Sequence, residues 1–151
     1  MEYNTSVWSP HKKEDTKFIE SVQRFYTKRV CQRLNIRFQD YTNRLSIMKL
    51  NTLEYRRLEF DLILLYKILH KIIHINLSIN KLQLNYNLRR HSSQLQHNSS
   101  SNTNLRRNFF SIRTIEVWNK LPEYIVSSPT LEIFKFKLRG FNLRSIFKFV
   151  F

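Results

Sequence analysis

The residues of this chain that are best suited to chemistry are its cations. Lysine and arginine number 26 against 11 aspartates and glutamates, which gives a formal net charge of +15 at pH 7. Such an excess favours a polyanionic partner, namely nucleic-acid phosphates, an acidic lipid surface or an acidic protein. The candidate nucleic-acid contacts are Lys13, Lys17, Arg24, Lys28, Arg89, Arg90, His91, Arg106, Arg107 and Arg113.

The charge is most one-sided in the middle of the chain. Residues 81–110 contain Lys81, Arg89, Arg90, Arg106 and Arg107 and no acid at all. The pairs Arg89-Arg90 and Arg106-Arg107 flank a stretch rich in Ser, Asn and Gln, His91 to Asn104. This composition predicts an exposed, mobile loop. Such a loop could close around a phosphate backbone without reading the bases. The alternative interpretation is a basic surface that is only solvated.

Carboxylates offer no evident catalytic arrangement. The only aspartates are Asp15, Asp40 and Asp61, and they fall on separate predicted elements. Two-metal phosphoryl chemistry needs carboxylates that converge on cations about 4 Å apart. A single glycine, Gly140, also excludes phosphate-cradling loops, which need several glycines. The sequence therefore predicts no catalytic residue on this chain.

Metal and cofactor chemistry is equally poorly represented. His70 and His74 have the i, i+4 spacing of two helical zinc ligands, but no third ligand lies near them in the sequence. We favour a half-buried pair at a helix end. Cys31 is the single cysteine, so an internal disulfide and a multi-cysteine cluster are both excluded. We expect no metal site and no cofactor.

The cellular compartment can be predicted from the same residue types. A lone cysteine fits a reducing compartment, the nucleus or the cytoplasm, and residues 1–9 lack the features of a secretory signal. The most apolar stretch, Leu58 to Leu77, is interrupted by Glu59, Asp61, Lys67, His70, Lys71 and His74. It is therefore assigned to a protein core, and no membrane partner is expected.

Helices must position the cations of the first half. Ser9-Pro10 has the residue types of a helix start. An amphipathic helix of about 22 residues should follow, ending near Asn35, with Lys13, Lys17, Arg24 and Lys28 close to one stripe. Its apolar residues are Phe18, Ile19, Val22, Phe25, Tyr26 and Val30.

Two more helices are expected before residue 75. The first spans about Gln39 to Lys49, with Tyr41, Leu45 and Met48 facing inward. The second starts at Asn51, which has capping-box spacing to Glu54. Its wide apolar stripe predicts packing on two neighbours, with a heptad dimer as the rival interpretation. The stripe comprises Tyr55, Leu58, Leu62, Ile63, Leu65, Tyr66, Leu69, Ile72 and Ile73.

The second half should begin with a short strand, because apolar residues alternate from Leu82 to Tyr86. Ser111 could then cap a helix through Trp118, and a turn or short helix covers Tyr124 to Val126. A last helix starts at Ser128-Pro129-Thr130, carries Leu131, Phe134 and Leu138, and is closed by Gly140 as a C-cap. The tail Ile146 to Phe151 has high β-propensity and would promote aggregation unless it packs on the core.

Together these patterns predict a mainly α fold: a small bundle of five or six helices that allows one short β-hairpin, with a long polar loop in the middle. We divide the chain into a helical part (1–75), a basic polar loop region (76–108), C-terminal helices (109–140) and a Phe-rich tail (141–151). Trp118 and Leu121 should fill the core.

The order of several motifs resembles one protein family. The stretches are Glu2 to Pro10, Ile19 to Lys28, Leu53 to Leu58 with Asp61-Leu62 and Tyr66 to His70, Arg89 to Ser92, Arg106 to Arg113, Trp118-Asn119-Lys120-Leu121-Pro122, and Ser128 to Lys135. In this order they resemble the region after the palm domain in non-LTR (LINE, jockey-like) retrotransposon reverse transcriptases. Arg90 stands where that family has a glycine.

The resemblance implies the thumb and post-thumb part of an RNA-directed DNA polymerase, whose catalytic aspartates lie upstream in the palm. The implied partners are the missing palm and fingers domain and an RNA or DNA duplex, held by its backbone. We therefore expect sequence-independent duplex binding without catalysis by this chain. The alternatives are a structural or protein-interaction remnant with incidental charge, and a membrane-surface module suggested by the aromatic and basic C-terminal segments.

Overall fold

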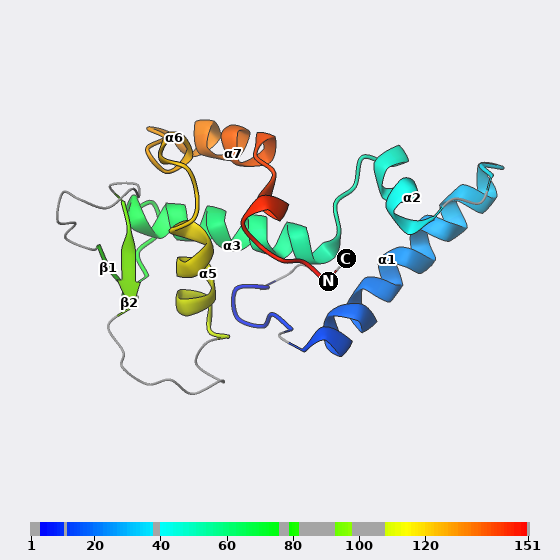
Figure 1. Cartoon of the computed structure of the whole chain (residues 1–151), viewed down its shortest axis with the longest axis horizontal. Helices are drawn as coiled ribbons and strands as arrows, with labels where there is room; N and C mark the ends of the chain where they lie inside the picture. Colours follow the sequence, from blue (N-terminus) through cyan, green and yellow to red (C-terminus); the bar gives the residue numbers. More distant parts are fainter. Residues whose placement is uncertain are drawn as a thin grey trace. The chain divides into compact units, whose positions relative to one another are not determined.

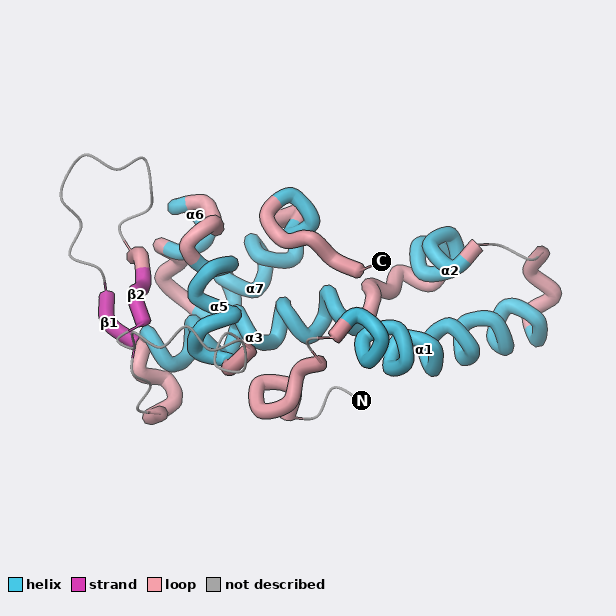
Figure 2. Tube along the Cα trace, turned by 60° about the horizontal axis from the view of Figure 1, so that its bottom comes forward, coloured by secondary structure: helices cyan, strands magenta, loops and turns pink. Residues whose placement is uncertain are grey.

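The computed structural model describes residues 4–10, 12–37, 40–75, 79–81, 93–97 and 108–150. These residues are mainly helical, as the periodicity predicts (Figures 1 and 2). In chain order the elements are α1 (Lys13–Arg33), α2 (Tyr41–Ile47), α3 (Leu53–Leu69), β1 (Ile79–Lys81), β2 (Leu95–His97), α5 (Phe110–Trp118), α6 (Glu123–Val126), α7 (Leu131–Gly140) and a short 3-10 helix, η1 (Leu143–Ser145).

The chain forms two compact units. Unit 1 comprises Met1–Arg57 with Phe149–Phe151, and unit 2 comprises Leu58–Lys148. Unit 1 therefore contains α1, α2 and the first turn of α3, whereas unit 2 contains the rest of α3 and all later elements. The candidate cations of α1 belong to unit 1, and Arg113 belongs to unit 2.

The long helix α1 has nearly the length predicted, but its start differs. It begins at Lys13, after Lys12 in extended conformation, and no side chain caps it. The prediction that Ser9-Pro10 opens the helix is therefore wrong. The C-terminal end is as expected, because Leu34 follows the last helical residue and Asn35 has a φ of 52°. Asparagine tolerates this left-handed conformation better than most residues.

The orientation of α1 is the main surprise of unit 1. Its buried residues are Thr16, Glu20, Gln23, Thr27 and Cys31, four of them polar. The apolar side of the same helix faces outward: the exposed fractions are 77% for Phe18, 46% for Val22, 61% for Phe25 and 63% for Tyr26. An amphipathic helix ordinarily buries its apolar face. Here specific hydrogen bonds, described below, replace apolar packing on the inner side.

Helix α2 follows the predicted pattern, with Tyr41 and Leu45 buried and Met48 half-buried. The start of α3 requires a correction. Thr52, rather than Asn51, caps this helix, because its Oγ1 accepts a hydrogen bond from the backbone N–H of Tyr55 at 3.2 Å. The carboxylate of Glu54 accepts from the backbone N–H of Val150 at 2.9 Å.

The core of unit 2 forms around α3. Leu62 and Leu65 are 0% exposed, and the Tyr66 ring stacks on Phe134 of α7 with centroids 4.4 Å apart. On another side of α3, Asp61 contacts Arg113 of α5. Figure 1 shows α7 running beside α3 and α5 crossing it at a steep angle, and Figure 2 shows the same elements from a second direction. Residues of α3 thus contact both α7 and α5, through the ring of Tyr66 and the carboxylate of Asp61; packing of the whole apolar stripe on two neighbours stays a prediction.

Trp118 lies at the centre of this core. Its side chain is 1% exposed, and its ring lies 5.9 Å from that of Phe134, centroid to centroid. The indole Nε1–H donates to the backbone oxygen of Ser93 at 3.0 Å. Leu121 is also buried, at 3% exposed. The prediction that Trp118 and Leu121 fill the core is confirmed.

A two-stranded antiparallel pair joins Ile79–Lys81 to Leu95–His97, with Asn80 opposite Gln96. The short strand predicted for Leu82–Tyr86 lies outside the described residues. Strand β2 falls within the segment His91–Asn104, which the sequence predicts as an exposed loop. That prediction is wrong for its described part, because Gln94 and Leu95 are each 1% exposed.

The amide of Asn119 supports the burial of Leu95. Its Oδ1 accepts from the backbone N–H of Leu95 at 3.0 Å, and its Nδ2 donates to the Leu95 carbonyl at 2.9 Å. One side chain thus satisfies both backbone groups of a buried residue, as a neighbouring strand would. The contact spans 24 residues of sequence, so no local pattern could indicate it.

The C-terminal helices match the prediction except at two ends. Helix α5 begins at Phe110, so Ser111 lies inside it and does not cap it. Thr130 does cap α7, through its Oγ1 and the Ile133 N–H. Gly140 is the last residue of α7 and has no positive φ, so it is not a glycine C-cap. In unit 1, Phe149 of the tail stacks on Tyr55 with centroids 5.3 Å apart.

Replacement of Trp118 by alanine should strongly destabilise the protein. The change removes a buried large aromatic and leaves the Ser93 carbonyl without its donor. We expect a loss of about 3–5 kcal/mol in the free energy of unfolding, measured by denaturant titration. Phe136→Ala, at an 81% exposed position, is the control and should change stability by less than about 0.5 kcal/mol. A loss below about 1 kcal/mol for Trp118→Ala would contradict this core.

Candidate nucleic-acid interface

Four of the candidate residues form one stripe on α1. At 3.6 residues per turn, Lys13, Lys17, Arg24 and Lys28 lie within about 60° of one another around the helix axis. All four side chains are exposed. We call this set the cation stripe. It runs from the first turn of α1 to near its last, over about 22 Å at 1.5 Å per residue.

The structure adds two cations that the sequence analysis did not select. Arg29 and Arg33 are exposed on the same helix. Between residues 16 and 34 the only acid is Glu20, and it is 0% exposed. The surface of this part of α1 therefore has five exposed cations (Lys17, Arg24, Lys28, Arg29 and Arg33) and no exposed acid. Both arginines lie in residues 21–34, a part of the predicted helix that contains no acid, and this local charge pattern would have indicated them.

The carboxylate of Glu20 anchors α1 in unit 1. Both of its oxygens accept from the backbone N–H of Leu53, at 3.2 and 3.0 Å, and Oε1 also accepts from the Tyr41 hydroxyl. Leu53 is the first residue of α3, where backbone N–H groups lack partners within the helix. The positive end of the helix dipole favours a carboxylate at this position.

Gln23, one turn further along α1, extends the same network. Its Nε2 donates to the Tyr41 hydroxyl at 3.2 Å and to the backbone oxygen of Asn51 at 2.9 Å. Burial raises the pKa of Tyr41 above its ordinary value of 10.0, and the hydrogen bond to Glu20 raises it further. The phenol therefore stays neutral and keeps its proton for Glu20.

Two arginines flank the Tyr41 ring. The Arg24 guanidinium carbon lies 4.7 Å from the ring centroid, and that of Arg44 lies 5.7 Å away. Arg44 is buried, and its Nε lies 3.5 Å from Thr27 Oγ1. Cation–π contacts of this kind orient a guanidinium. The polar network thus positions Arg24 of the cation stripe as well as the helix that carries it.

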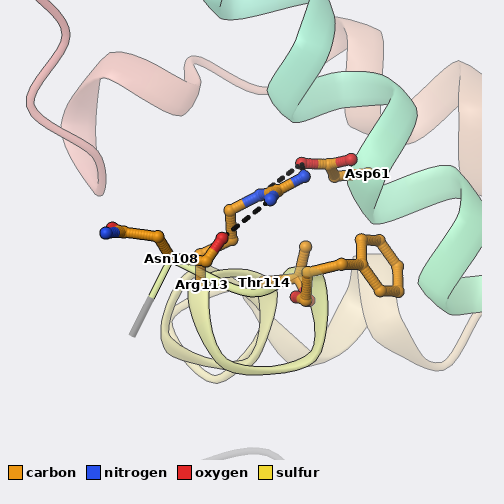
Figure 3. Close-up of polar contacts among 5 residues, drawn as sticks. Asp61, Asn108, Arg113 and Thr114 are labelled. Atoms are coloured by element: carbon orange, nitrogen blue, oxygen red, sulfur yellow. Dashed lines mark hydrogen bonds and ion pairs between the residues drawn. The ribbon is translucent and has the colours of Figure 1, made fainter. Parts of the chain in front are cut away.

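Arg113, the described candidate of unit 2, binds other residues of the chain through its guanidinium (Figure 3). Its Nε and Nη2 lie 3.0 Å from Asp61 Oδ2, and its Nη1 donates to the Asn108 carbonyl at 2.9 Å. The Arg113 side chain is 20% exposed and that of Asp61 is 4% exposed. These contacts join α5 to α3. A phosphate contact by Arg113 stays a prediction, and its geometry supports a structural role.

The other candidates lie outside the described residues: Arg89, Arg90, His91, Arg106 and Arg107. Their contribution to an interface therefore rests on the sequence alone, and the described part of the candidate interface is the surface of α1.

The described residues also bear on other chemistries. Within these ranges no three or more His, Cys, Asp or Glu side chains come together as a possible metal site. His70 stacks on Tyr66 with ring centroids 4.0 Å apart. In the described part of the chain, no helix combines the length and apolar character needed to cross a membrane. Comparisons with family models, curated proteins and solved structures found no match to this chain.

Replacement of Tyr41 by phenylalanine tests the polar network through its pH dependence. A raised pKa in the folded state stabilises the protein fully below pH 10 and less as the pH rises above it, because the unfolded phenol ionises first. Tyr41→Phe lacks this pH-dependent contribution to the free energy of unfolding, because phenylalanine has no ionisable group. We expect it to lower the free energy of unfolding by about 1–2 kcal/mol at pH 7, since it removes two hydrogen bonds.

The difference between the two proteins should shrink by about 1 kcal/mol between pH 8 and pH 11. Urea titrations across this range measure it. Tyr26→Phe, at a 63% exposed ring, is the control at neutral pH and should leave stability unchanged. A difference that stays constant up to pH 11 would contradict the proposed protonation of Tyr41.

The contact between Arg113 and Asp61 is tested by a double-mutant cycle. Arg113→Ala leaves a nearly buried carboxylate without its guanidinium, so we expect a loss of about 2 kcal/mol or more. Asp61→Ala in the same chain should recover part of that loss, with a coupling energy of about 1 kcal/mol or more. Additive effects of the two substitutions would show that the pair does not stabilise the contact of α5 with α3.

Proposed function

We propose that this chain is a non-catalytic nucleic-acid-binding module that holds an RNA–DNA or DNA duplex by its backbone phosphates. The observation that carries the proposal is the surface of α1 between residues 16 and 34, with five exposed cations and no exposed acid. Lysine and arginine gain affinity for a duplex by releasing the counterions condensed on its phosphates.

The geometry of the cation stripe suits a backbone contact. A duplex rises about 3.4 Å per base pair, so the roughly 22 Å of the stripe correspond to six or seven base pairs. The helix presents the cations of the stripe four, seven and four residues apart, on long stems that follow phosphates without specifying a base. Binding should therefore be independent of sequence.

The origin that we propose is the thumb and post-thumb part of a reverse transcriptase from a non-LTR retrotransposon. The support is the order of motifs in the sequence, together with the roles of several motif residues in folding. Glu20 and Gln23 anchor α1 by hydrogen bonds to the backbone before and at the start of α3. Trp118 and Asn119 form hydrogen bonds to the backbone of the segment that contains β2. In this proposal the palm and fingers domain of the parent polymerase is the protein partner.

A nuclear or cytoplasmic location belongs to the same proposal. Cys31, the only cysteine of the chain, is a free thiol buried on the inner side of α1. A reducing compartment keeps such a thiol reduced.

The test is binding of a short fluorescein-labelled RNA–DNA duplex at several salt concentrations. The logarithm of the affinity should fall linearly with the logarithm of salt concentration from about 50 to about 200 mM. In the variant Lys17→Gln/Lys28→Gln, binding should be weaker on every duplex sequence, and the salt slope should be smaller by about 2.

A matched control separates contact from total charge. Lys120→Gln/Lys148→Gln removes the same charge from exposed positions of unit 2. This variant should keep most of the wild-type salt slope. Equal losses in the two variants would show that net charge alone attracts the duplex. A wild-type affinity that does not change with salt would contradict phosphate contacts altogether, and would favour the protein-interaction alternative.

A further inference from the structure

The outward apolar residues of α1 need an explanation that the duplex contact does not supply. Phe18, Val22, Phe25 and Tyr26 form this second set, which we call the apolar stripe. At 46–77% exposed, these side chains form an apolar face on the part of α1 before Arg29, on the side opposite the buried residues. Exposed apolar patches of this extent commonly mark an interaction site.

The two phenylalanines are aligned along the helix. Phe18 and Phe25 are seven residues apart, so they lie within about 20° of the same line and about 10 Å apart along the axis. The Arg29 guanidinium carbon lies 5.2 Å from the Phe25 ring centroid. Lys17 and Lys28 of the cation stripe lie about a quarter turn away around the helix. Flat apolar rings and cations are therefore adjacent along most of α1.

The charge of this surface selects the occupant. A second copy of the chain would bring the same five cations opposite themselves, which is unfavourable. An interfacial lipid contact would place Arg29 at the centre of the buried face, because its guanidinium lies over the Phe25 ring. A polyanion with flat, stackable groups matches both stripes at once. Unpaired nucleotides have this chemistry, since every base has a π-face and every phosphate a negative charge.

We infer that α1 binds single-stranded nucleic acid, with bases stacked on Phe18 and Phe25 and phosphates on the cation stripe. This inference rests on the proposed function and extends it from paired to unpaired nucleotides. A stacked strand rises about 3.4 Å per nucleotide, so the two rings would contact bases about three nucleotides apart. In a duplex the bases are paired and stacked on one another, so the rings contribute only where the strands are unpaired.

The experiment compares two strands that differ only in their bases. One is an oligothymidylate, and the other is an abasic oligodeoxyribonucleotide with the same number of phosphates. Wild-type protein should bind the oligothymidylate about tenfold more tightly, since stacking on aromatic side chains supplies this much or more. Fluorescence anisotropy at one fixed salt concentration measures both affinities.

Substitution of the rings then identifies the site. Phe18→Leu/Phe25→Leu keeps apolar side chains but removes the rings, and should abolish the preference for the strand with bases while leaving the abasic affinity unchanged. Phe18→Trp/Phe25→Trp should restore the preference. The matched control is Phe109→Leu/Phe136→Leu, at exposed positions of unit 2, which should behave as wild type. Lys17→Gln/Lys28→Gln should weaken binding of both strands.

The outcomes separate the two proposals. Equal affinity of wild-type protein for both strands, or a full preference in the leucine variant, overturns stacking and leaves salt-dependent duplex binding intact. Absence of salt-dependent binding to any strand or duplex overturns the proposed function, and this inference with it. Two other results would also overturn the inference, because they assign the apolar stripe to another occupant. One is a wild-type protein that is dimeric while the leucine variant is monomeric. The other is a leucine variant that loses binding to phosphatidylserine-containing vesicles and keeps wild-type binding to both strands.

Discussion

The buried carboxylate of Glu20 is the contact on which the cation-bearing part of the chain depends. It receives the first backbone N–H of α3 and the hydroxyl of Tyr41 on α2, so one side chain of α1 joins three elements. A carboxylate without partners would be very unfavourable in such a position. With these partners it acts as a specific connector: α1 can take only the rotation about its axis that brings Glu20 to Leu53. That rotation also determines where every other side chain of α1 points.

The consequence is a helix whose usual arrangement is reversed. Because Glu20, Gln23 and Thr27 supply the packed side, the phenylalanines and Val22 face outward, and the lysines lie between the two sides. A helix held by apolar packing would have hidden the rings and presented only charge. The hydrogen-bonded inner side instead leaves α1 with two kinds of exposed chemistry, cationic and aromatic, in neighbouring stripes. The proposals for duplex and single-strand binding both start from this single fact of orientation.

Described polar residues of unit 2 also connect elements. Asn119 satisfies both backbone groups of Leu95, Arg113 joins Asp61, and the Tyr66 hydroxyl donates to the Ser128 carbonyl at 2.7 Å. Asn119, Asp61, Arg113 and Tyr66 all lie in the sequence motifs on which the proposed origin rests. The motifs can thus be understood physically as the contacts that hold a helical fold around α3. Arg113, which the sequence selects as a phosphate contact, forms an ion pair with Asp61 in this unit.

The sequence by itself determined the helical class, the approximate positions of the helices, the core around Trp118 and the one-sided charge, because periodicity and composition are local properties. The sequence predicted the structure least well where contacts between residues far apart in the chain determine burial. Residues 18–30 show two faces in the sequence, but burial of the polar one depends on Leu53, 33 residues from Glu20. The polar segment around Leu95 forms a strand and buries Leu95 with partners that are distant in the sequence, Asn119 and Trp118 among them. Tertiary structure therefore decided which face of α1 is available for binding, since a side chain is buried by what packs on it and not by its own polarity.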